Sequence, residues 1–229
     1  MTDYSVLDLF AGLGGFSAAF ADSDRWDVTT VEINGEFDPD IEADIFDLRP
    51  SDFDQGFDVI LASPPCTQFS LAASSLERIV DGEPQTDDAA DAVGLVYHTE
   101  GLIRGLSPEY WFMENPQGFL RQIIGQPDAR VTYCQYGKDY MKPTDLWGDH
   151  PAGLSYRACS YGDECHQYNT DRNHGGDGNV RTMFQQTTSG TNAAERAKVP
   201  YDLSEAIRDA CEAGLDGNAV EQQTLGAIE

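Results

Sequence analysis

Short apolar runs alternate with glycine turns and polar helical stretches over the first 150 residues of this 229-residue chain. Six runs predict strands: 4–8, 27–31, 56–62, 109–113, 130–135 and 145–147. Three stretches predict helices: 14–20, 87–106 and 201–212. This alternation predicts an α/β domain built on a mostly parallel twisted sheet with helices on both faces. The length suits one domain with a substantial core.

The pattern breaks down after the last predicted strand. Residues 148–195 are rich in Gly, Asn, Asp, Thr and Ser and lack periodicity, which predicts an irregular insert. We therefore expect the α/β domain to comprise residues 1–147 plus 196–213. Residues 214–229 are expected to form a flexible tail.

The charge balance is unusual, with 40 acidic residues against 14 basic ones and a net charge of −26. A nucleic-acid binder normally shows a basic footprint, so one interpretation is that this surface does not contact nucleic acid. The other is adaptation to very high salt, where a Debye length of about 3 Å at 1 M screens repulsion between like charges. Scarce lysine and dispersed acids favour the salt interpretation.

Three features of the sequence predict a soluble intracellular protein. No apolar run approaches the ~20 residues that a membrane helix needs, and the first residues lack the features of a signal peptide. The five cysteines are odd in number and scattered, which fits a reducing compartment. We expect a cytoplasmic monomer without a membrane partner.

Residues 8–15 (DLFAGLGG) follow the first strand and open the first helix. Glycines there allow a tight turn and close approach of the backbone to a ligand. Glu32 ends the next strand, where a carboxylate can hold ribose hydroxyls, and Asp44 could accept from an adenine amine. The motif Gly-x-Gly-x-x-Gly and nearby cations are missing, so a nucleoside fits better than a dinucleotide. The plain alternative is a strand–helix connection.

A second site is predicted after the strand at 56–62, where residues 63–70 (SPPCTQFS) begin. The two prolines present Cys66 at the carboxyl edge of the sheet, where it could act as a nucleophile. A buried structural cysteine is the alternative. Glu114 and Asn115 reach the same edge from the next strand, and together with Cys66 they favour a catalytic site.

These segments resemble the motifs of the DNA cytosine-5 methyltransferase family. Residues 8–15 resemble its first motif, 65–70 its Pro-Cys nucleophile loop and 114–115 its Glu-Asn-Val motif. Tyr136-Gly137 falls where the family has an aromatic-glycine pair, and residues 196–207 resemble its last motif, whose helix packs beside the first.

The resemblance implies a Rossmann-like class I fold that uses S-adenosylmethionine, with residues 1–147 and 196–213 as its catalytic domain. Cys66 would add to C6 of a flipped cytosine in DNA, and Glu114 would engage N3 and the exocyclic amine while C5 takes the methyl group. Asn115 and Lys142 complete the expected catalytic set. The expected cofactor residues are Asp8, Phe10, Ala11, Gly12, Gly14, Gly15, Glu32, Ile33, Asp44, Ile45 and Pro64.

The chain departs from the family pattern at several positions. Gln68 stands two places after Cys66 instead of directly after it, and Pro116 replaces the valine of the Glu-Asn-Val motif. Residues 141–145 (MKPTD) replace a Gln-Arg-x-Arg segment, so Lys142 would substitute for an arginine that contacts cytosine O2. The insert at 148–195 is shorter than a usual domain of at least ~50 residues. The chain would then recognise a short target sequence or none, or a separate partner would supply the specificity.

We expect no metal site, although the insert offers a candidate. Cys159, Cys165 and His166 could bind zinc with His150 or His174 as a fourth ligand. Their Cys-x5-Cys-His spacing is not usual for a zinc finger, and a plain loop is the preferred interpretation. Arg157, Arg172 and Arg181 could contact phosphates of DNA or be ordinary solvated charges.

Three other functions stay open. Ser63-Pro64-Pro65 also fits a methyltransferase that acts on an exocyclic amine such as N4 of cytosine, but Cys66 stands where those enzymes have an aromatic residue. C5 chemistry could act on RNA or a free cytosine nucleotide. A non-catalytic DNA-binding subunit would have lost Cys66 or Glu114, and both are present. The biological role could be restriction–modification, protection of a viral genome or regulation.

Overall fold

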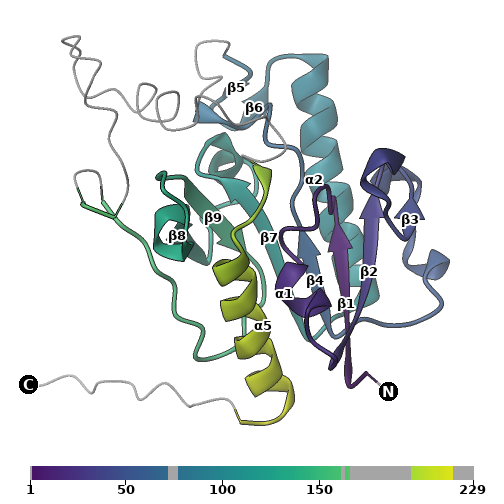
Figure 1. Ribbon diagram of the computed structural model, residues 1–229. Helices are drawn as coiled ribbons and strands as arrows, with labels where there is room; N and C mark the ends of the chain where they lie inside the picture. Colours follow the sequence, from purple (N-terminus) through teal and green to yellow (C-terminus); the bar gives the residue numbers. More distant parts are fainter. Residues whose placement is uncertain (1, 72–76, 161–162, 166–196, 219–229) are drawn as a thin grey trace, which may run out of the picture.

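The computed structural model of the chain describes residues 2–71, 77–160, 163–165 and 197–218 (Figure 1). Its central sheet has seven strands in the order β3-β2-β1-β4-β7-β9-β8. β9 runs antiparallel to both of its neighbours, β7 and β8, and the other adjacent strands pair in parallel, so the predicted mostly parallel α/β sheet is confirmed. The strands are β1 (Tyr4–Leu9), β2 (Trp26–Glu32), β3 (Ile41–Glu42), β4 (Val59–Ala62), β7 (Tyr110–Pro116), β8 (Ala129–Thr132) and β9 (Pro143–Trp147).

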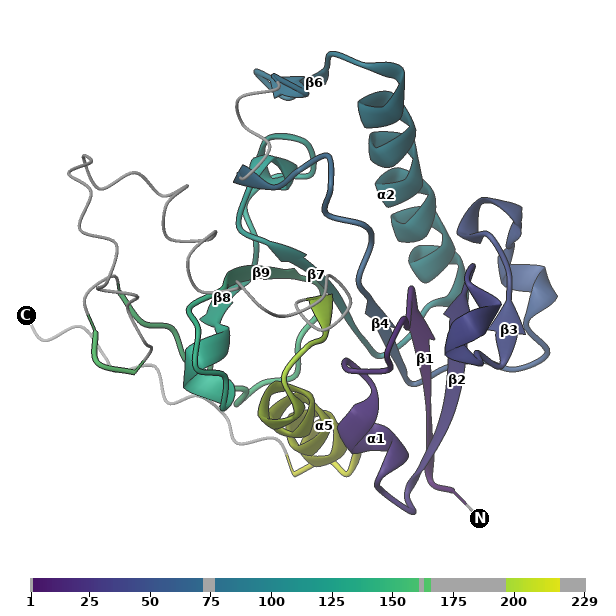
Figure 2. The ribbon, with the colours of Figure 1, turned by 45° about the horizontal axis from the view of Figure 1, so that its top comes forward.

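Helices cover both faces of this sheet (Figure 2). In the described part of the chain the α-helices are α1 (Ala18–Ala21), α2 (Asp87–Leu106) and α5 (Tyr201–Leu215). Short 3-10 helices fill the connections: η1 (Gly35–Phe37), η2 (Ile45–Asp47), η3 (Pro50–Asp52), η5 (Phe119–Gln122) and η6 (Tyr133–Tyr136). A separate hairpin joins β5 (Ile79–Val80) to β6 (Glu83–Pro84).

The strand residues alternate between two cores, as the period of two in a β-strand requires. Val59 and Leu61 of β4 face the core that holds α1 and α5, whereas Ile60 and Ala62 face the core under α2. All four side chains are fully buried. This explains why β4 reads as a continuous apolar run, since a parallel strand covered on both faces has no polar side.

Helix α2 begins and ends at residues suited to those positions. The Thr86 side chain accepts from the backbone N–H of Ala89 at 3.2 Å, and acidic residues in the first turn complement the helix dipole. Ser107 ends the helix in the left-handed conformation.

Several predicted boundaries differ from those observed. The helix expected at 14–20 begins only at Ala18, because Gly12 and Gly14 adopt φ of +49° and +66° and turn the chain before it. The strand expected at 130–135 ends at Thr132, where η6 begins. The strand expected at 56–62 starts at Val59, and the helix expected at 201–212 continues to Leu215.

Helix α5 returns to pack against α1, as the resemblance of residues 196–207 to the last family motif led us to expect. The buried Ser204 side chain joins the two elements by donating to the Phe16 carbonyl at 2.6 Å and accepting from Ala19 N–H at 3.1 Å. This contact brings residues 197–199 next to the glycine turn that follows β1.

The described beginning of the predicted insert, residues 148–160, packs on the sheet domain. Leu154 and Cys159 are buried, and Thr132 N–H donates to the Arg157 carbonyl at 3.1 Å. The larger part of the insert and the end of the tail lie outside the described residues. Among the described helices, none combines the length and apolar character needed to cross a membrane.

Candidate active site

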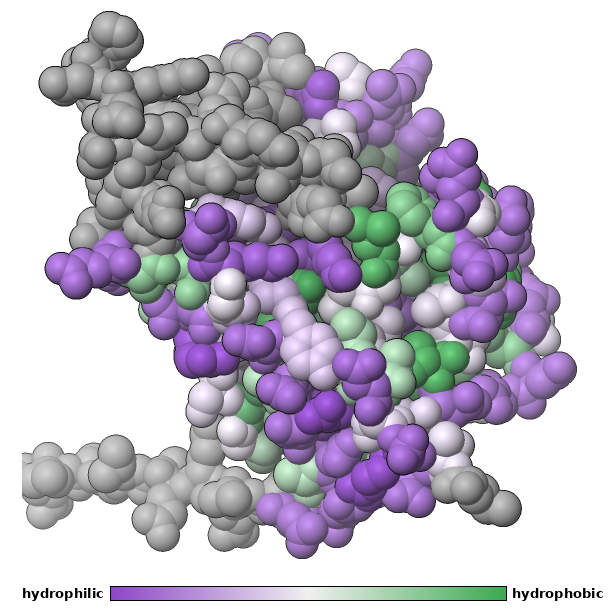
Figure 3. Space-filling model, viewed as in Figure 1, coloured by the Kyte–Doolittle hydropathy of each residue, from purple (hydrophilic) through white to green (hydrophobic). Residues whose placement is uncertain are grey.

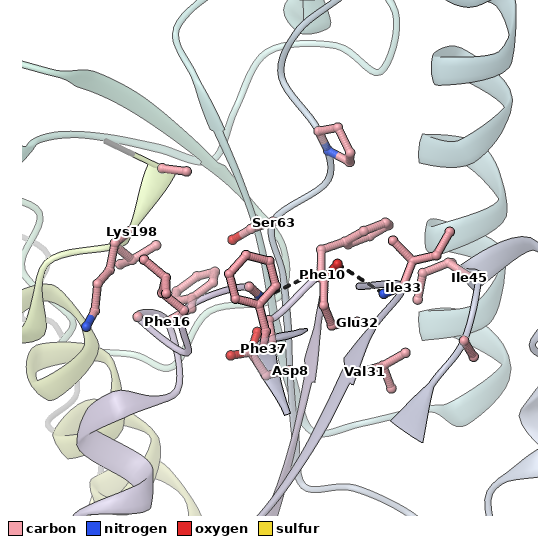
Figure 4. A pocket seen from close by; sticks show the side chains of 18 of the residues that line it. Asp8, Phe10, Phe16, Val31, Glu32, Ile33, Phe37, Ile45, Ser63 and Lys198 are labelled. Atoms are coloured by element: carbon pink, nitrogen blue, oxygen red, sulfur yellow. Dashed lines mark hydrogen bonds between the residues drawn. The ribbon is translucent and has the colours of Figure 1, made fainter. Parts of the chain in front are cut away.

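The carboxyl ends of β1, β2 and β4 surround a cavity of about 520 Å³ (Figure 4). Ligands bind at this edge in open α/β sheets, so the cavity lies where the fold favours a site. It is lined by nearly all the predicted cofactor residues: Asp8, Phe10, Ala11, Gly12, Gly15, Glu32, Ile33, Asp44 and Ile45. Ser63 and Pro65 line it from the loop that carries Cys66.

The two remaining predicted cofactor residues, Gly14 and Pro64, are not among the lining residues. Gly14 N–H donates to the Ala11 carbonyl at 2.7 Å and so closes the turn. The Pro64 carbonyl accepts from the Asn115 side chain at 2.9 Å. Both residues therefore support the backbone segments whose neighbouring residues line the cavity.

Asp8 is a buried carboxylate at the base of the cavity. Its Oδ2 accepts from the Ser17 hydroxyl at 2.6 Å, whereas its Oδ1 is buried without a hydrogen-bond partner. The pKa of Asp8 is raised to about 7, mainly by burial and also by the charge of Glu32, while the hydrogen bonds from Ser17 act to lower it. An unpaired buried oxygen favours a ligand that brings a donor or a positive charge.

Glu32 ties the glycine turn to the end of β2. Its Oε2 accepts from Gly12 N–H at 3.0 Å, and its Oε1 accepts from Ile33 N–H at 3.0 Å and Asn34 N–H at 3.1 Å. Figure 4 shows this carboxylate between Phe10 and Ile33. The prediction placed Glu32 at this strand end, and the structure adds its role in the turn.

Apolar side chains line the mouth of the cavity. Ile33 is 63% exposed and Phe46 is 41% exposed, although both are large and apolar. Asp44 lies beside them, and its Oδ1 accepts from Phe46 N–H at 3.0 Å. Exposed apolar groups around a concave site favour a flat apolar ligand group with a polar edge.

Sequence reasoning missed other lining residues, namely Leu13, Phe16, Val31, Phe37, Ala43, Phe46, Leu95, Ala197, Lys198 and Val199. Phe16, Val31 and Phe46 adjoin predicted motifs, so proximity in the sequence could have suggested them. Leu95 and residues 197–199 reach the cavity only through the packing of α2 and α5.

The loop after β4 holds Cys66 in a tight turn. The Cys66 carbonyl accepts from Phe69 N–H at 3.0 Å and Ser70 N–H at 2.9 Å, while the Phe69 side chain is fully buried. Gly118 packs so closely here that a Cβ would lie 2.2 Å from the Phe69 carbonyl oxygen. The loop that carries Cys66 is thus held by the buried Phe69 side chain and by close packing against Gly118, which follows β7.

The Cys66 thiol is partly buried, and this burial raises its pKa. The positive charge of Lys142 lowers the pKa of Cys66, and the negative charge of Glu114 raises it. Both predicted partners are therefore close enough to influence the thiol.

Glu114 lies in the second half of β7, which extends beyond the predicted strand to Pro116. The Glu114 side chain is buried, and its Oε1 accepts from the Tyr133 hydroxyl at 2.9 Å. Lys142 Nζ lies 3.6 Å from the same oxygen and 3.2 Å from the Tyr133 hydroxyl. Tyr133, which sequence reasoning missed, thus joins the two predicted catalytic residues.

Asn115 follows Glu114 in β7, so its side chain lies on the opposite face of the strand. It is fully buried, and its Nδ2 donates to the Pro64 carbonyl. In this arrangement Asn115 positions the Cys66 loop.

The predicted metal ligands are only partly brought together. Cys159 and Cys165 lie within 4.8 Å of each other and of a third cysteine, Cys134. His150 instead stacks on Phe112 with the ring centroids 4.3 Å apart, and its Nδ1 contacts the Tyr156 hydroxyl. His166 and His174 lie outside the described residues.

Of the three arginines predicted as possible phosphate contacts, only Arg157 lies in the described part of the chain. The Arg157 guanidinium lies 4.2 Å from the centroid of the Tyr136 ring, so at least part of its role is to pack on η6. Arg172 and Arg181 are outside the described part of the chain.

A parallel sheet with one reversed strand next to its edge, bearing a ligand cavity at the carboxyl ends of β1 and β2, defines a class I methyltransferase fold. Within this class, the loop that carries Cys66 and the position of Glu114 in β7 match the motifs that resemble those of cytosine-5 methyltransferases. The chain belongs to the C-5 cytosine-specific DNA methylase family, whose model matches residues 4–126.

Two sequence relatives support this membership, and one solved structure is reported beside them for its similarity alone. The chain is 31% identical over 172 residues to a probable DNA (cytosine-5)-methyltransferase of Frog virus 3, covering 70% of this chain and 77% of that protein. It is 29% identical over 156 residues to the type II methyltransferase M.HaeII of Haemophilus aegyptius, covering 60% of this chain but only 45% of that protein. A solved structure of the Entamoeba histolytica methyltransferase EhMeth matches 70% of this chain and 58% of that chain, with 13% identity and a TM-score of 0.48.

Proposed function

We propose that this protein methylates C5 of a flipped cytosine in DNA through a covalent adduct of Cys66, with S-adenosylmethionine as methyl donor. The observation that carries the proposal is that Cys66 lies directly beside the cavity at the carboxyl ends of the strands. Ser63 and Pro65 line the cavity, and Cys66 follows them directly, within electrostatic reach of Glu114 and Lys142. A ligand in the cavity and a base at Cys66 would then be neighbours.

The cavity residues fit S-adenosylmethionine, which supplies an electrophilic methyl group when it is bound. Asp8 Oδ1 and Ser63 Oγ are buried without partners, so each has an open position toward a ligand. Asp8 would attract the cationic amino-acid portion. Glu32 would accept from ribose hydroxyls, and Asp44 would accept from the adenine amine beside Ile33 and Phe46.

At the cytosine, Cys66 Sγ would form a bond to C6 after losing its proton. Electron density then moves toward N3, where Glu114 would act as the general acid. Tyr133 and Lys142 hold the Glu114 side chain, and Lys142 would also contact O2 of the base. Once C5 has taken the methyl group, which would leave S-adenosylhomocysteine, a base would remove the C5 proton and the C6–Sγ bond would break to release Cys66 as a thiolate.

Recognition of the target sequence is proposed to be limited. The insert at 148–195 is shorter than a usual recognition domain, so a separate specificity partner would extend the contact with DNA. The net charge of −26 opposes binding to phosphates unless salt screens it, so binding is proposed to occur at high salt.

The test is to incubate the full chain at high salt with methyl-labelled S-adenosylmethionine and duplex DNA, and then to digest the DNA to nucleosides. Label in 5-methyldeoxycytidine supports the proposal, and Cys66→Ser should remove it. Cys211→Ser is a matched control, since that cysteine lies in the α5 core and should leave the label in place.

Trapping tests the adduct separately. In the presence of S-adenosylmethionine, duplex DNA containing 5-fluorocytosine should form a denaturation-resistant complex with the native chain but not with Cys66→Ser. Fluorine replaces the C5 proton and cannot leave as a cation, so the cysteine cannot be eliminated after methylation. Label in N4-methyldeoxycytidine, or C5 methylation that survives Cys66→Ser, would overturn the mechanism. Label found only with RNA or free nucleotides would change the substrate.

A further inference from the structure

Three cysteines from separate parts of the chain meet at the end of β8. Cys134 lies in η6, whereas Cys159 and Cys165 lie beyond β9. The Sγ atoms of Cys134 and Cys159 are 3.2 Å apart, those of Cys165 and Cys134 are 3.7 Å apart, and all three lie within 4.8 Å of one another. The proposed methyl transfer uses none of these thiols.

We infer that Cys134, Cys159 and Cys165 form a zinc-binding site that fastens the start of the insert to the catalytic domain. Zinc bonds to thiolate sulfur at about 2.3 Å with tetrahedral angles, which places ligand sulfurs roughly 3.8 Å apart. The separations of 3.2 and 3.7 Å lie slightly below this value, and the third is no more than 4.8 Å. They also exceed the ~2.05 Å of a disulfide bond.

The backbone around the cluster holds the thiols in place. Thr132 Oγ1 accepts from Cys159 N–H at 2.9 Å and lies 3.3 Å from Cys159 Sγ, which makes it a donor to that sulfur. Arg130 donates to the Cys159 carbonyl at 3.2 Å, and Arg157 N–H donates to the Tyr136 hydroxyl at 3.0 Å. Such supporting hydrogen bonds orient metal ligands before the ion binds.

Within the described part of the chain the cluster offers three thiols, so the fourth zinc position would be taken by water or by another ligand. Cys134 and Cys159 are buried, whereas Cys165 is partly exposed and gives the ion a route from solvent. Because Cys134 directly follows Tyr133, zinc would fix the segment up to Cys165 against the element that supports Glu114.

The test uses the full chain, reduced and stripped of metal, and titrated with Co²⁺ alone. We expect one ion per chain, a thiolate-to-cobalt charge-transfer band in the near ultraviolet and tetrahedral bands in the visible. An equimolar amount of Zn²⁺ should displace the cobalt, and native mass spectrometry should show one retained zinc. Added zinc should also raise the Tm.

Cys165→Ser is the main variant, because a partly exposed position tolerates substitution best. It should weaken metal affinity by at least about tenfold, since even changes behind the ligands have effects of that size. Cys134→Ser and Cys159→Ser should do the same where they fold. Cys66→Ser and Cys211→Ala, which lie outside the cluster, should keep the metal and its spectrum.

Three outcomes would overturn the inference. One is unchanged cobalt affinity in a Cys165→Ser chain whose circular dichroism is native. Another is an ion that binds without a thiolate band or is lost on desalting. The third is a reduced native chain that takes up no metal and forms only a Cys134–Cys159 disulfide on oxidation. Each readout is independent of methyl transfer, so failure here leaves the proposed function intact.

Discussion

At the residue scale, two opposite charges act on the Cys66 thiol. Lys142 lowers the pKa of Cys66 and Glu114 raises it, on top of the larger increase caused by burial. The thiolate is the reactive form of cysteine, so each charge also changes the pH at which Cys66 reacts.

We predict that Lys142→Met moves the alkylation of Cys66 by iodoacetamide to higher pH, because the stabilising charge is lost. Glu114→Gln should move it to lower pH, while methylation falls about 10²–10⁴-fold through loss of the acid. Mass spectrometry of the Cys66 peptide at a series of pH values measures both shifts. Arg104→Met, at an exposed end of α2, is the control. Shifts of the same sign in both variants would contradict this assignment.

Asp8 supports a second prediction at this scale, because its folded pKa of about 7 lies far above the ~3.9 of a free aspartate. The folded protein therefore holds a proton that the unfolded chain releases between these pH values. The contribution of Asp8 to stability consequently falls as the pH rises from about 4 to about 7. A cationic ligand favours ionised Asp8, so its binding releases this proton.

The affinity for S-adenosylmethionine should accordingly be about tenfold higher at pH 8 than at pH 6. Isothermal titration calorimetry at the two pH values measures the difference. Asp8→Asn should bind more weakly and lose the pH dependence, whereas Asp47→Asn, at an exposed position, should retain it. A dependence that persists in Asp8→Asn would assign it to another group.

At the element scale, the glycine turn after β1 packs against the segment that precedes α5. A Cβ on Gly15 would lie 2.8 Å from Val199 N and 2.9 Å from Val199 O, both of them backbone atoms. The turn can therefore approach α5 only with glycine at this position. Since both segments line the cavity, their packing also sets its shape.

Gly15→Ala is predicted to lower the free energy of unfolding by about 1–3 kcal/mol, the usual cost of overpacking, and to weaken cofactor binding. Gly101→Ala is the matched control. Its Cβ would meet open space in α2, so it should be neutral or stabilise by up to about 1 kcal/mol. Urea unfolding measures both. An unaffected Gly15→Ala protein would show that the Val199 backbone moves away easily.

At the scale of the whole molecule, the dominant property is negative charge. Figure 3 shows hydrophilic residues over most of the described surface in that view, with smaller apolar areas between them. Self-repulsion among 40 acidic residues opposes the compact state and is screened by salt.

We predict that the Tm rises by several degrees between 0.1 M and 2 M KCl, because screening relieves this repulsion. Differential scanning calorimetry gives the values. A variant in which the exposed residues Asp24, Asp54 and Asp91 are changed to asparagine should show a smaller response. A Tm that is constant or falls with salt would argue against adaptation to high salt.

Local chemistry along the chain was enough to place most of the site on the correct edge of the sheet. A buried run followed by a polar residue marks the carboxyl end of a parallel strand, and all such ends lie together. Asp8, Glu32 and Glu114 lie in the carboxyl-terminal halves of β1, β2 and β7, and Cys66 follows β4, so their convergence could be predicted. The mostly parallel sheet followed from the same alternation.

Contacts between distant segments required the folded structure. Tyr133 reaches Glu114 because β7 and β8 both pair with β9, and Cys134 meets Cys159 because the segment after β9 returns along η6. Leu95 and Val199 enter the cavity only when α2 and α5 pack on the sheet. Periodicity and turn chemistry are local properties of the sequence. They do not predict which side chains come into contact across the core. Those partners are set by packing and strand register.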